Sequence, residues 1–479
     1  MACVAHPTWA VVNAARRSVL LSTALLLAAC IHYEPKPLDA GVSVRQFGSR
    51  TLDDPTLREQ IQTILVDSPS QWPLASWNRA QLLAAALSLN PKLAIARDEV
   101  QSSLAHEITA GEMPNPDLTL QSEYAKHDPH PWLYGLGLDV LFRTPERKRL
   151  DIDQARLDVS NTRWDLMNEA WSVRHALLAA LSDRESAVRR SALLGQLAAA
   201  QNALYDIEQR RIAAGEDAPD ALLVSGQARI EIEQQQVQAR TDLATANAAL
   251  AIALGVPSSA ISGLHIDWPA WGDPPASEAR TLSDLREQAL LSRSDLAAAI
   301  DAYAIAENKL HLAILQQYPQ FHFLPGYYWD HGISKYPFDV SFGLPFNRTR
   351  GEIAEATAQR DVQGKRMVAM QAAIFGELDT AERSEQIARD GVEAALRGLD
   401  AMRRQQRQAE LGQRLGSTGA NESVAAQILA LRGELETLQM RTQLQNARNA
   451  LEDALHAPLS GPELALSKPL PVAIAGTKP

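Results

Sequence analysis

Cysteine is almost absent from this sequence of 479 residues, in which Cys3 and Cys30 are the only two. If the first 29 residues are removed as an export signal, the remaining chain keeps one cysteine and cannot form a disulfide within itself. Long apolar runs are also missing, because no later segment reaches 18 uninterrupted apolar residues. That length excludes a spanning helix there, so we expect any further part that crosses a bilayer to be β.

Other absences exclude whole classes of function. The balance of 46 Lys and Arg against 57 Asp and Glu gives a net charge of −11, which argues against a nucleic-acid partner. The sequence has no glycine-rich phosphate loop, no His-Glu-x-x-His, no Cys-x-x-Cys and no nucleophile elbow. We therefore expect no enzyme activity, no cofactor and no metal site. Polar residues of two loops, at 127–130 and 330–331, could gather and touch a metal, but solvated loop side chains are the alternative.

The N-terminus has the pattern of an export signal. The basic pair Arg16-Arg17 precedes an apolar run over residues 19–29, which is shorter than the roughly 20 residues that span a bilayer. The run ends in Leu27-Ala28-Ala29-Cys30, which resembles the bacterial lipobox, where the signal is cut before a cysteine that becomes diacylated and N-acylated. An ordinary signal with a chance cysteine is the alternative. We predict that Cys30 is the lipid anchor. Ile31 replaces the Asp of an inner-membrane retention signal, which favours the outer membrane.

The chain repeats itself with a period near 200 residues. Residues 116–120 recur at 319–323, a separation of 203, and Leu254 and Pro257 recur as Leu455 and Pro458, a separation of 201. Matching charged and small residues keep the same order between these anchors. The sequence therefore predicts a tandem repeat rather than unrelated domains.

Each half is predicted to contain a helix, two strands, a very long helix, a tip loop and a helix. In the first half, residues 78–112 have a helical composition and the strands follow a break at 114–116. No proline occurs between Pro145 and Pro219, or between Pro345 and Pro458, and proline costs roughly 3 kcal/mol inside a helix. A helix from 147 to 211 would be about 100 Å long. Residues spaced by sevens give it coiled-coil character: Leu150, Leu157, Trp164, Trp171 and Leu178, with Ile353, Met367 and Ile374 in the second half. A cytoskeletal coiled coil fits these heptads but does not explain the strands.

Two short alternating segments lie between the helices of each half, and each segment has one apolar face. Aromatic residues gather near the turns of these hairpins, although only 5% of the chain is aromatic, as in the girdles of membrane barrels. A half-buried strand of a soluble sheet would also alternate, but the aromatic clusters favour a face that contacts outer-membrane lipid. The predicted lipid-facing residues are Leu118, Leu120, Leu136, Leu138, Phe338, Val340 and Phe342. Four strands leave two open edges, which cost several kcal/mol per unsatisfied group in hydrocarbon, so other copies must close the barrel.

This combination of lipobox, tandem repeat and strand pairs resembles the TolC-like outer-membrane efflux proteins over about residues 75–460. The resemblance implies a chain that is mainly α with a small transmembrane β part. It implies a homotrimer with a twelve-stranded β-barrel in the outer membrane, continuous with a periplasmic α-helical barrel. On this basis we predict a signal peptide at 1–29, an N-terminal extension at 30–75, repeats at 76–258 and 279–458, and a tail at 459–479.

The two tip loops are the predicted binding sites. The resemblance implies that they meet a periplasmic adaptor, or membrane fusion protein, at Arg211, Gly215, Arg414, Gly416 and Gly419. The structural alternative is that glycine ends one helix while Asp220 or Asn421 caps the next.

The function implied is passive conduction of drugs, metal ions or other small solutes. An inner-membrane pump, of the resistance-nodulation-division type, would supply the energy. A type I protein-secretion duct shares the same fold. A lipoprotein that tethers envelope layers without conducting is the alternative from another class.

Overall fold

The computed structural model describes residues 33–65, 71–275, 282–344, 346–347 and 349–466. The predicted anchor Cys30 lies outside the described residues. The chain divides into two compact units, residues 1–49 and 50–479. In the first unit, α2 spans Ala40–Gly48, and the side chain of its N-cap Asp39 accepts hydrogen bonds from two backbone N–H groups.

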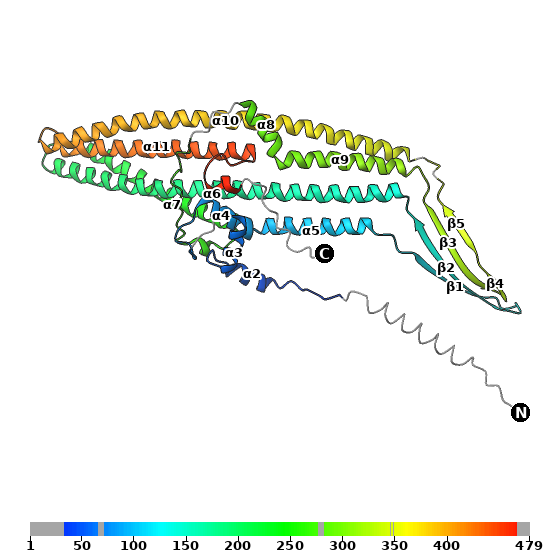
Figure 1. The fold of residues 1–479 in the computed structure, drawn as a ribbon. Coiled ribbons are helices and arrows are strands. Elements are labelled where there is room, and N and C mark those ends of the chain that lie inside the picture. The colour runs from blue at the N-terminus through cyan, green and yellow to red at the C-terminus, as the bar shows by residue number, and fades with distance from the viewer. Residues whose placement is uncertain (1–32, 66–70, 276–281, 345, 348, 467–479) are drawn as a thin grey trace. The chain divides into compact units, whose positions relative to one another are not determined.

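The second unit contains long helices and one small antiparallel sheet (Figure 1). This confirms the predicted class, which is mostly helical with a minor β part. In chain order, its elements are α3 (Pro55–Ile64), α4 (Arg79–Leu89), α5 (Pro91–Gly111), β1 (Asp117–Tyr124), β2 (Trp132–Phe142), α6 (Pro145–Ala213), α7 (Asp220–Leu254), η1 (Ser258–Ile261), α8 (Leu282–Ser292), α9 (Ser294–Leu315), β3 (Phe321–Asp330), β4 (Ile333–Lys335), β5 (Phe338–Phe342), α10 (Arg350–Arg414), α11 (Ala420–Leu455) and η2 (Pro462–Leu466).

The long helices form two antiparallel hairpins that lie side by side. Helix α6 has 69 residues and packs against α7, while α10 has 65 residues and packs against α11. Helix α6 also packs against α11, which joins the two halves of the chain (Figure 1). Near the tips, α6 and α10 pack against α7 and α11. Nearer the sheet, they pack against α5 and α9 instead. Four helices therefore run together along the whole helical part.

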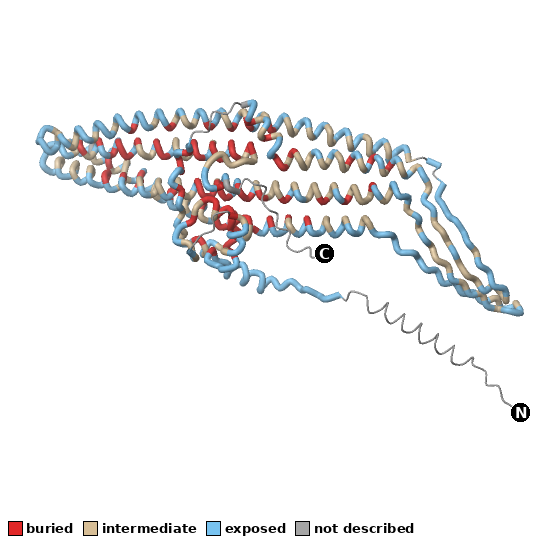
Figure 2. Tube along the Cα trace, in the orientation of Figure 1, coloured by how far each residue is buried: buried red, intermediate tan, exposed pale blue. Residues whose placement is uncertain are grey.

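The main core lies midway along the helices. There α4 and α5 pack on α6 and α7, and buried residues concentrate at this place in Figure 2. Leu82, Leu177 and Leu250 are fully buried in it, and burying a leucine stabilises the fold by about 1.5–3 kcal/mol. Trp77 hydrogen-bonds across to the segment after α7, with its N–H 2.9 Å from the His265 carbonyl. The tips and the sheet are mostly exposed in Figure 2.

The first helix of each half is interrupted, where the sequence predicted continuous helix over 78–112. Asn90 ends α4 in extended backbone and its side chain then caps α5, which begins at Pro91. Proline has no N–H to donate and disfavours helical backbone in the residue before it, which explains the break. Arg293 marks the corresponding break between α8 and α9.

The sheet has five strands instead of the predicted four. Strand β3 pairs with β2 on one side and with β4 and β5 on the other. The additional strand is β4, which precedes the last predicted strand and is separated from it by Pro337. Proline has no N–H for the ladder, although the Pro337 carbonyl accepts from Gly326 at 2.9 Å. A two-residue turn, His331-Gly332, joins β3 to β4 with both φ angles positive, as a tight hairpin requires.

Candidate functional site

The sheet carries one continuous apolar face. The register places Leu118 opposite Leu138 and Leu120 opposite Leu136, and then Leu136 opposite Tyr327. Phe321 and Phe323 of β3 lie opposite residues of β5 on the same face. The predicted lipid-facing residues therefore share one side of the sheet: Leu118, Leu120, Leu136, Leu138, Phe338, Val340 and Phe342. All are exposed except Leu138, which is half-buried, and Leu120 is 75% exposed.

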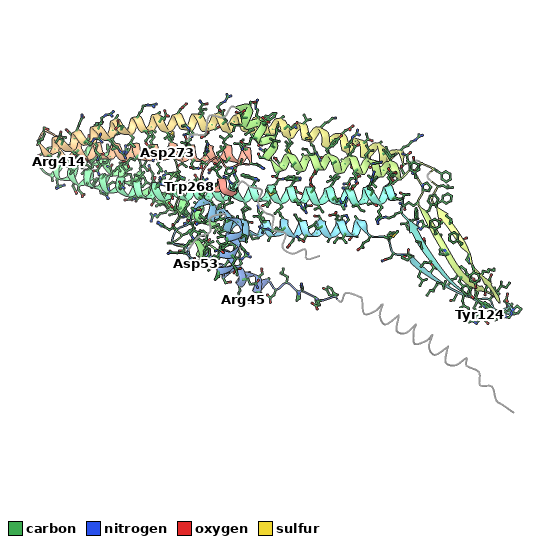
Figure 3. The ribbon with its side chains drawn as sticks, viewed as in Figure 1. Arg45, Asp53, Tyr124, Trp268, Asp273 and Arg414 are labelled. Atoms are coloured by element: carbon green, nitrogen blue, oxygen red, sulfur yellow. The ribbon has the colours of Figure 1, made fainter. Side chains whose placement is uncertain are left out.

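Aromatic rings extend this face at the far end of the sheet. Trp132 packs edge-on against Tyr124 at 4.9 Å between ring centroids and stacks on Tyr134 at 5.7 Å. Tyr327 lies 5.3 Å from Tyr336 across the neighbouring strands. Tyr124 is labelled at this end of the unit in Figure 3, opposite to Arg414 at the helix tips. The apolar face thus has an aromatic border at its outer end.

The other face of the sheet carries polar residues and glycines, with Leu133, Leu141 and Leu324 among them. His322 Nδ1 lies 2.9 Å from Asp139 Oδ1 across β2 and β3. The ring of Tyr328 lies over Gly135, where a Cβ atom would come within 2.2 Å of Tyr328 Cδ1. Gly135 is therefore required for close approach of this ring rather than for backbone freedom. One face is apolar and the opposite face is more polar, an asymmetry that is typical of a sheet between lipid and water.

The sheet has two edges without partners in the described part of the chain. Strand β1 pairs only with β2 there, and β5 pairs only with β3. Open edges offer unpaired N–H and C=O groups to another strand. The sheet is thus suited to association with further copies.

The first tip is closed by an ion pair. Arg211 Nε donates to Asp217 Oδ2 at 2.6 Å, and Nη2 donates to Oδ1 at 3.2 Å. These hydrogen bonds raise the pKa of Arg211 and lower the pKa of Asp217. Gly215 follows the end of α6 with φ of 77°, the left-handed conformation that favours glycine. Helix α7 begins at Asp220. The N-cap residue of this helix is Pro219, and no side chain makes a capping hydrogen bond there.

The second tip is more open. Arg414 is exposed at the last turn of α10 and has no ion pair among the described residues. Gly416, with φ of 76°, holds the left-handed position that follows α10. Gly419 is the N-cap of α11 and accepts from the N–H of Ser423, so Asn421 lies inside the helix and is not its cap. The five predicted tip residues therefore lie at the two helix tips, with Arg211 and Arg414 in the last turns of α6 and α10 and the three glycines after them. Arg211 is held by an ion pair, and among the described residues Arg414 has none.

A groove of about 770 Å³ runs between the two hairpins next to these tips. All four long helices contribute to its walls, which carry charged residues such as Glu208, Glu422 and Arg432 beside apolar ones such as Leu204 and Leu429. Such a mixed groove suits another helix with both polar and apolar side chains.

A buried charge network joins the two halves at the middle of the helices, and sequence reasoning missed it. Arg174 of α6 is 4% exposed and contacts Glu452 and Asp453 of α11 and Glu463 of η2. Burial opposes its charge, but these carboxylates outweigh it and raise the pKa of Arg174 further. Arg79 is at the start of α4, and its Nε lies 3.1 Å from Glu463 Oε1. The available signal was a lone arginine in the mostly apolar stretch 173–181 of α6.

Two features are absent from the described residues. No group of three or more His, Cys, Asp or Glu side chains in the described part could hold a metal ion. Among the described helices, none is both long and apolar enough to cross a membrane.

Similarity to known proteins is found in three dimensions. No protein-family model matches the sequence, and no curated protein matches it in sequence. The fold matches the outer-membrane channel OprN with 17% identity and a TM-score of 0.66, covering 89% of this chain and 98% of OprN. It matches CusC, described as undergoing transmembrane channel formation, with 16% identity and a TM-score of 0.66, over 81% of this chain and 95% of CusC.

A third match is the outer-membrane protein VceC from Vibrio cholerae, with 14% identity and a TM-score of 0.65, over 80% of this chain and 97% of VceC. Each match spans nearly the whole of the similar protein, so the likeness includes both the helices and the strands. The chain therefore has the fold of the TolC-like outer-membrane efflux channels.

Proposed function

We propose that this protein is the outer-membrane channel of a tripartite efflux system and conducts small solutes passively. The single observation that carries the proposal is the sheet, whose apolar face and open edges suit a lipid-facing barrel built from several copies. The similarity of the fold to OprN and CusC supports it. The channel itself performs no chemistry, so the energy comes from an inner-membrane pump.

The proposed assembly is a homotrimer with a twelve-stranded barrel. Its β1 edge would pair with the outer strand of the next copy, because an unpaired edge in hydrocarbon costs several kcal/mol per group. The long helices would extend through the periplasm, with acylated Cys30 as a second attachment to the membrane. The transported solutes would be drugs, metal ions or similar small compounds.

The test of conduction is a current measurement. Purified full-length protein is reconstituted into a planar lipid bilayer, and we expect discrete single-channel currents. Mass spectrometry of the same preparation reports whether the mature chain begins at acylated Cys30. A folded protein that inserts without any current would contradict the channel and favour an envelope tether.

The tips are proposed to bind a periplasmic adaptor. Because Arg211 is bound to Asp217 while Arg414 is exposed and has no ion pair in the described part of the chain, the two arginines should behave differently. We expect Arg414→Glu to lower adaptor crosslinking and export without changing oligomer assembly. Arg211→Glu should in addition disturb the first loop, since it places a carboxylate beside Asp217.

Crosslinking to the adaptor and export by intact cells measure this prediction. Arg397→Glu is the matched control, because Arg397 is a highly exposed arginine on α10 away from the tip. Equal crosslinking by the Arg414→Glu and Arg397→Glu variants would remove Arg414 from the docking surface.

A further inference from the structure

The two halves of the chain end their last long helices in the same backbone conformation but with different residues. Gly255 follows α7 with φ of 72°, and His456 follows α11, 201 residues later, with φ of 46°. Glycine takes this left-handed conformation without strain, whereas a residue with a Cβ atom does not. A strained residue persists where its surroundings hold it in place, and such residues gather at switches and binding sites.

The surroundings of His456 differ from those of Gly255. A Cβ atom at Gly255 would lie 2.6 Å from the Leu89 carbonyl oxygen, so no side chain fits there. The ring of His456 instead stacks on Trp171 of α6, with centroids 5.0 Å apart and planes 22° apart. Its Nδ1 lies 3.4 Å from Ser294 Oγ of α9.

This ring therefore joins segments from both halves. Ser294 Oγ donates to Asn168 Oδ1 of α6 at 2.6 Å. Through Trp171, Asn168 and Ser294, the ring holds the end of α11 and the start of α9 against the middle of α6. Helices α9 and α11 belong to the second half of the chain, and α6 belongs to the first.

The charged groups around His456 are already paired with one another. Arg293 binds both Asp295 and Glu377, and Asp453 binds His175 and Arg174, so these carboxylates already share neighbouring cations. The helix end offers little more, because the carbonyls of 454 and 455 already accept from the side chains of 293 and 292. Asp295, Asp453 and Glu377 favour a proton on His456, but burial of the ring and the nearby charge of Arg293 oppose it more strongly.

Water can reach the ring. A cavity of about 290 Å³ is lined by Trp171, His175, His456 and the carboxylates of Asp295 and Asp453. Protons can therefore reach His456 without unfolding of the surrounding helices.

We infer that His456 is a proton-sensitive latch, which holds the two halves together when its ring is neutral and releases the end of α11 from α6 when its ring is protonated. The proposal deepens the proposed function, on which its consequence for conduction rests. Release would loosen α11 against α6, which are the helices that join the two tip hairpins. Acid would in this way favour movement of the tips.

The direction of the pH effect follows from the buried state. Burial, and then the charge of Arg293, lower the pKa of His456 to about 4, compared with about 6.5 for a free histidine. As the pH falls below about 6.5, the pKa of a free histidine, the released ring takes up a proton before the latched ring does. The latch is therefore complete at neutral pH, and it is lost as the pH falls toward the pKa of the latched His456 ring.

Hydrogen exchange with mass spectrometry tests the latch directly in the full-length protein. Exchange of peptides covering 447–457 and 165–176 is compared at about pH 7 and about pH 4.5, after correction for the intrinsic effect of pH on exchange. We expect exchange to rise about threefold or more in the wild type, because the helix end opens. His456→Asn keeps a residue that tolerates positive φ but removes the titration, and it should abolish the rise.

Two further variants complete the experiment. His106→Asn removes an exposed histidine of α5 that lies outside the cavity, and its acid response should equal that of the wild type. If His456→Asn does not fold, His456→Gly provides the residue that the first half uses at this position. An equal rise in wild type and His456 variants, or no rise in the wild type, would overturn the latch.

Bilayer currents separate this proposal from the function on which it rests. We expect the open probability of the wild-type channel to increase at about pH 4.5 and that of His456→Asn to stay unchanged. A wild type without current at any pH contradicts the proposed channel, while the exchange result still decides the latch. A channel whose acid response survives in His456→Asn contradicts the latch alone.

Discussion

Arg174 is the residue whose loss should cost the most stability. It is buried beside Glu452 and Glu463, which are both about 1% exposed, so its removal takes one cation from each and leaves them, in the described part of the chain, only Arg448 and Arg79. Breaking a buried ion pair on one side costs about 3–5 kcal/mol. We expect Arg174→Met to lower the thermal unfolding midpoint strongly, measured by circular dichroism of the purified protein.

Arg397→Met is the matched control for this change. Arg397 pairs with Glu393 on an exposed face of α10, with exposed fractions of 72% and 65%. Such exposed helix pairs contribute about 0.3–0.5 kcal/mol, so its unfolding midpoint should barely move. Similar midpoints for both variants would show that the network around Arg174 does not hold the two halves together.

Residue-scale features divide into those that local patterns reveal and those that they do not. The alternation from Phe338 to Phe342 was enough to predict which side chains share a face of the sheet. The partners of Arg174 lie 278 residues or more away in the chain, so no local pattern indicates them. The left-handed backbone of His456 was equally hidden, although alignment of the two halves sets it opposite Gly255.

At the scale of elements, the positions of proline predicted the long helices well, but they did not lead us to the break between α4 and α5. The long intervals without proline correspond to α6 and α10, together with the helices that follow them. The interruption at Asn90 was missed because alanine-rich sequence on both sides hid the N-cap and the proline that follows it. The short strand β4 was missed because its three residues, 333–335, are too few to show an alternating pattern.

The junction between α4 and α7 gives a test at this scale. Gly255 has positive φ, and a Cβ atom there would also come within 2.9 Å of Asn90 Cα. The conformation alone costs about 1–2 kcal/mol for alanine, and the collision with the backbone of α4 adds to it. We expect Gly255→Ala to lower the unfolding midpoint clearly more than Gly263→Ala.

Gly263 is a suitable control because its φ is also positive, at 83°, and a Cβ atom there has no neighbour within 4 Å. Thermal unfolding of the two variants measures the difference. Equal midpoints would mean that the chain shifts freely at this junction and that α4 does not fix the end of α7.

At the scale of the whole molecule, the two faces of the sheet lead to a prediction about insertion. Val340 lies opposite Phe323 on the apolar face, and Ser341 lies opposite His322 on the polar face. A lipid-facing arginine near the bilayer midplane costs about 2–4 kcal/mol, whereas a substitution on the water side mainly changes conduction. Three copies in one barrel would each bear this cost.

We therefore expect Val340→Arg to reduce the yield of membrane-inserted oligomer, and Ser341→Arg to assemble normally with altered conductance or ion selectivity. The two positions are neighbours in β5 and are both exposed, so the variants differ only in the face that carries the charge. Yield is measured by native mass spectrometry of detergent-extracted membranes, and conduction by single-channel recording. If both variants assemble equally well, the apolar face does not contact lipid, and the sheet must associate with another protein surface instead.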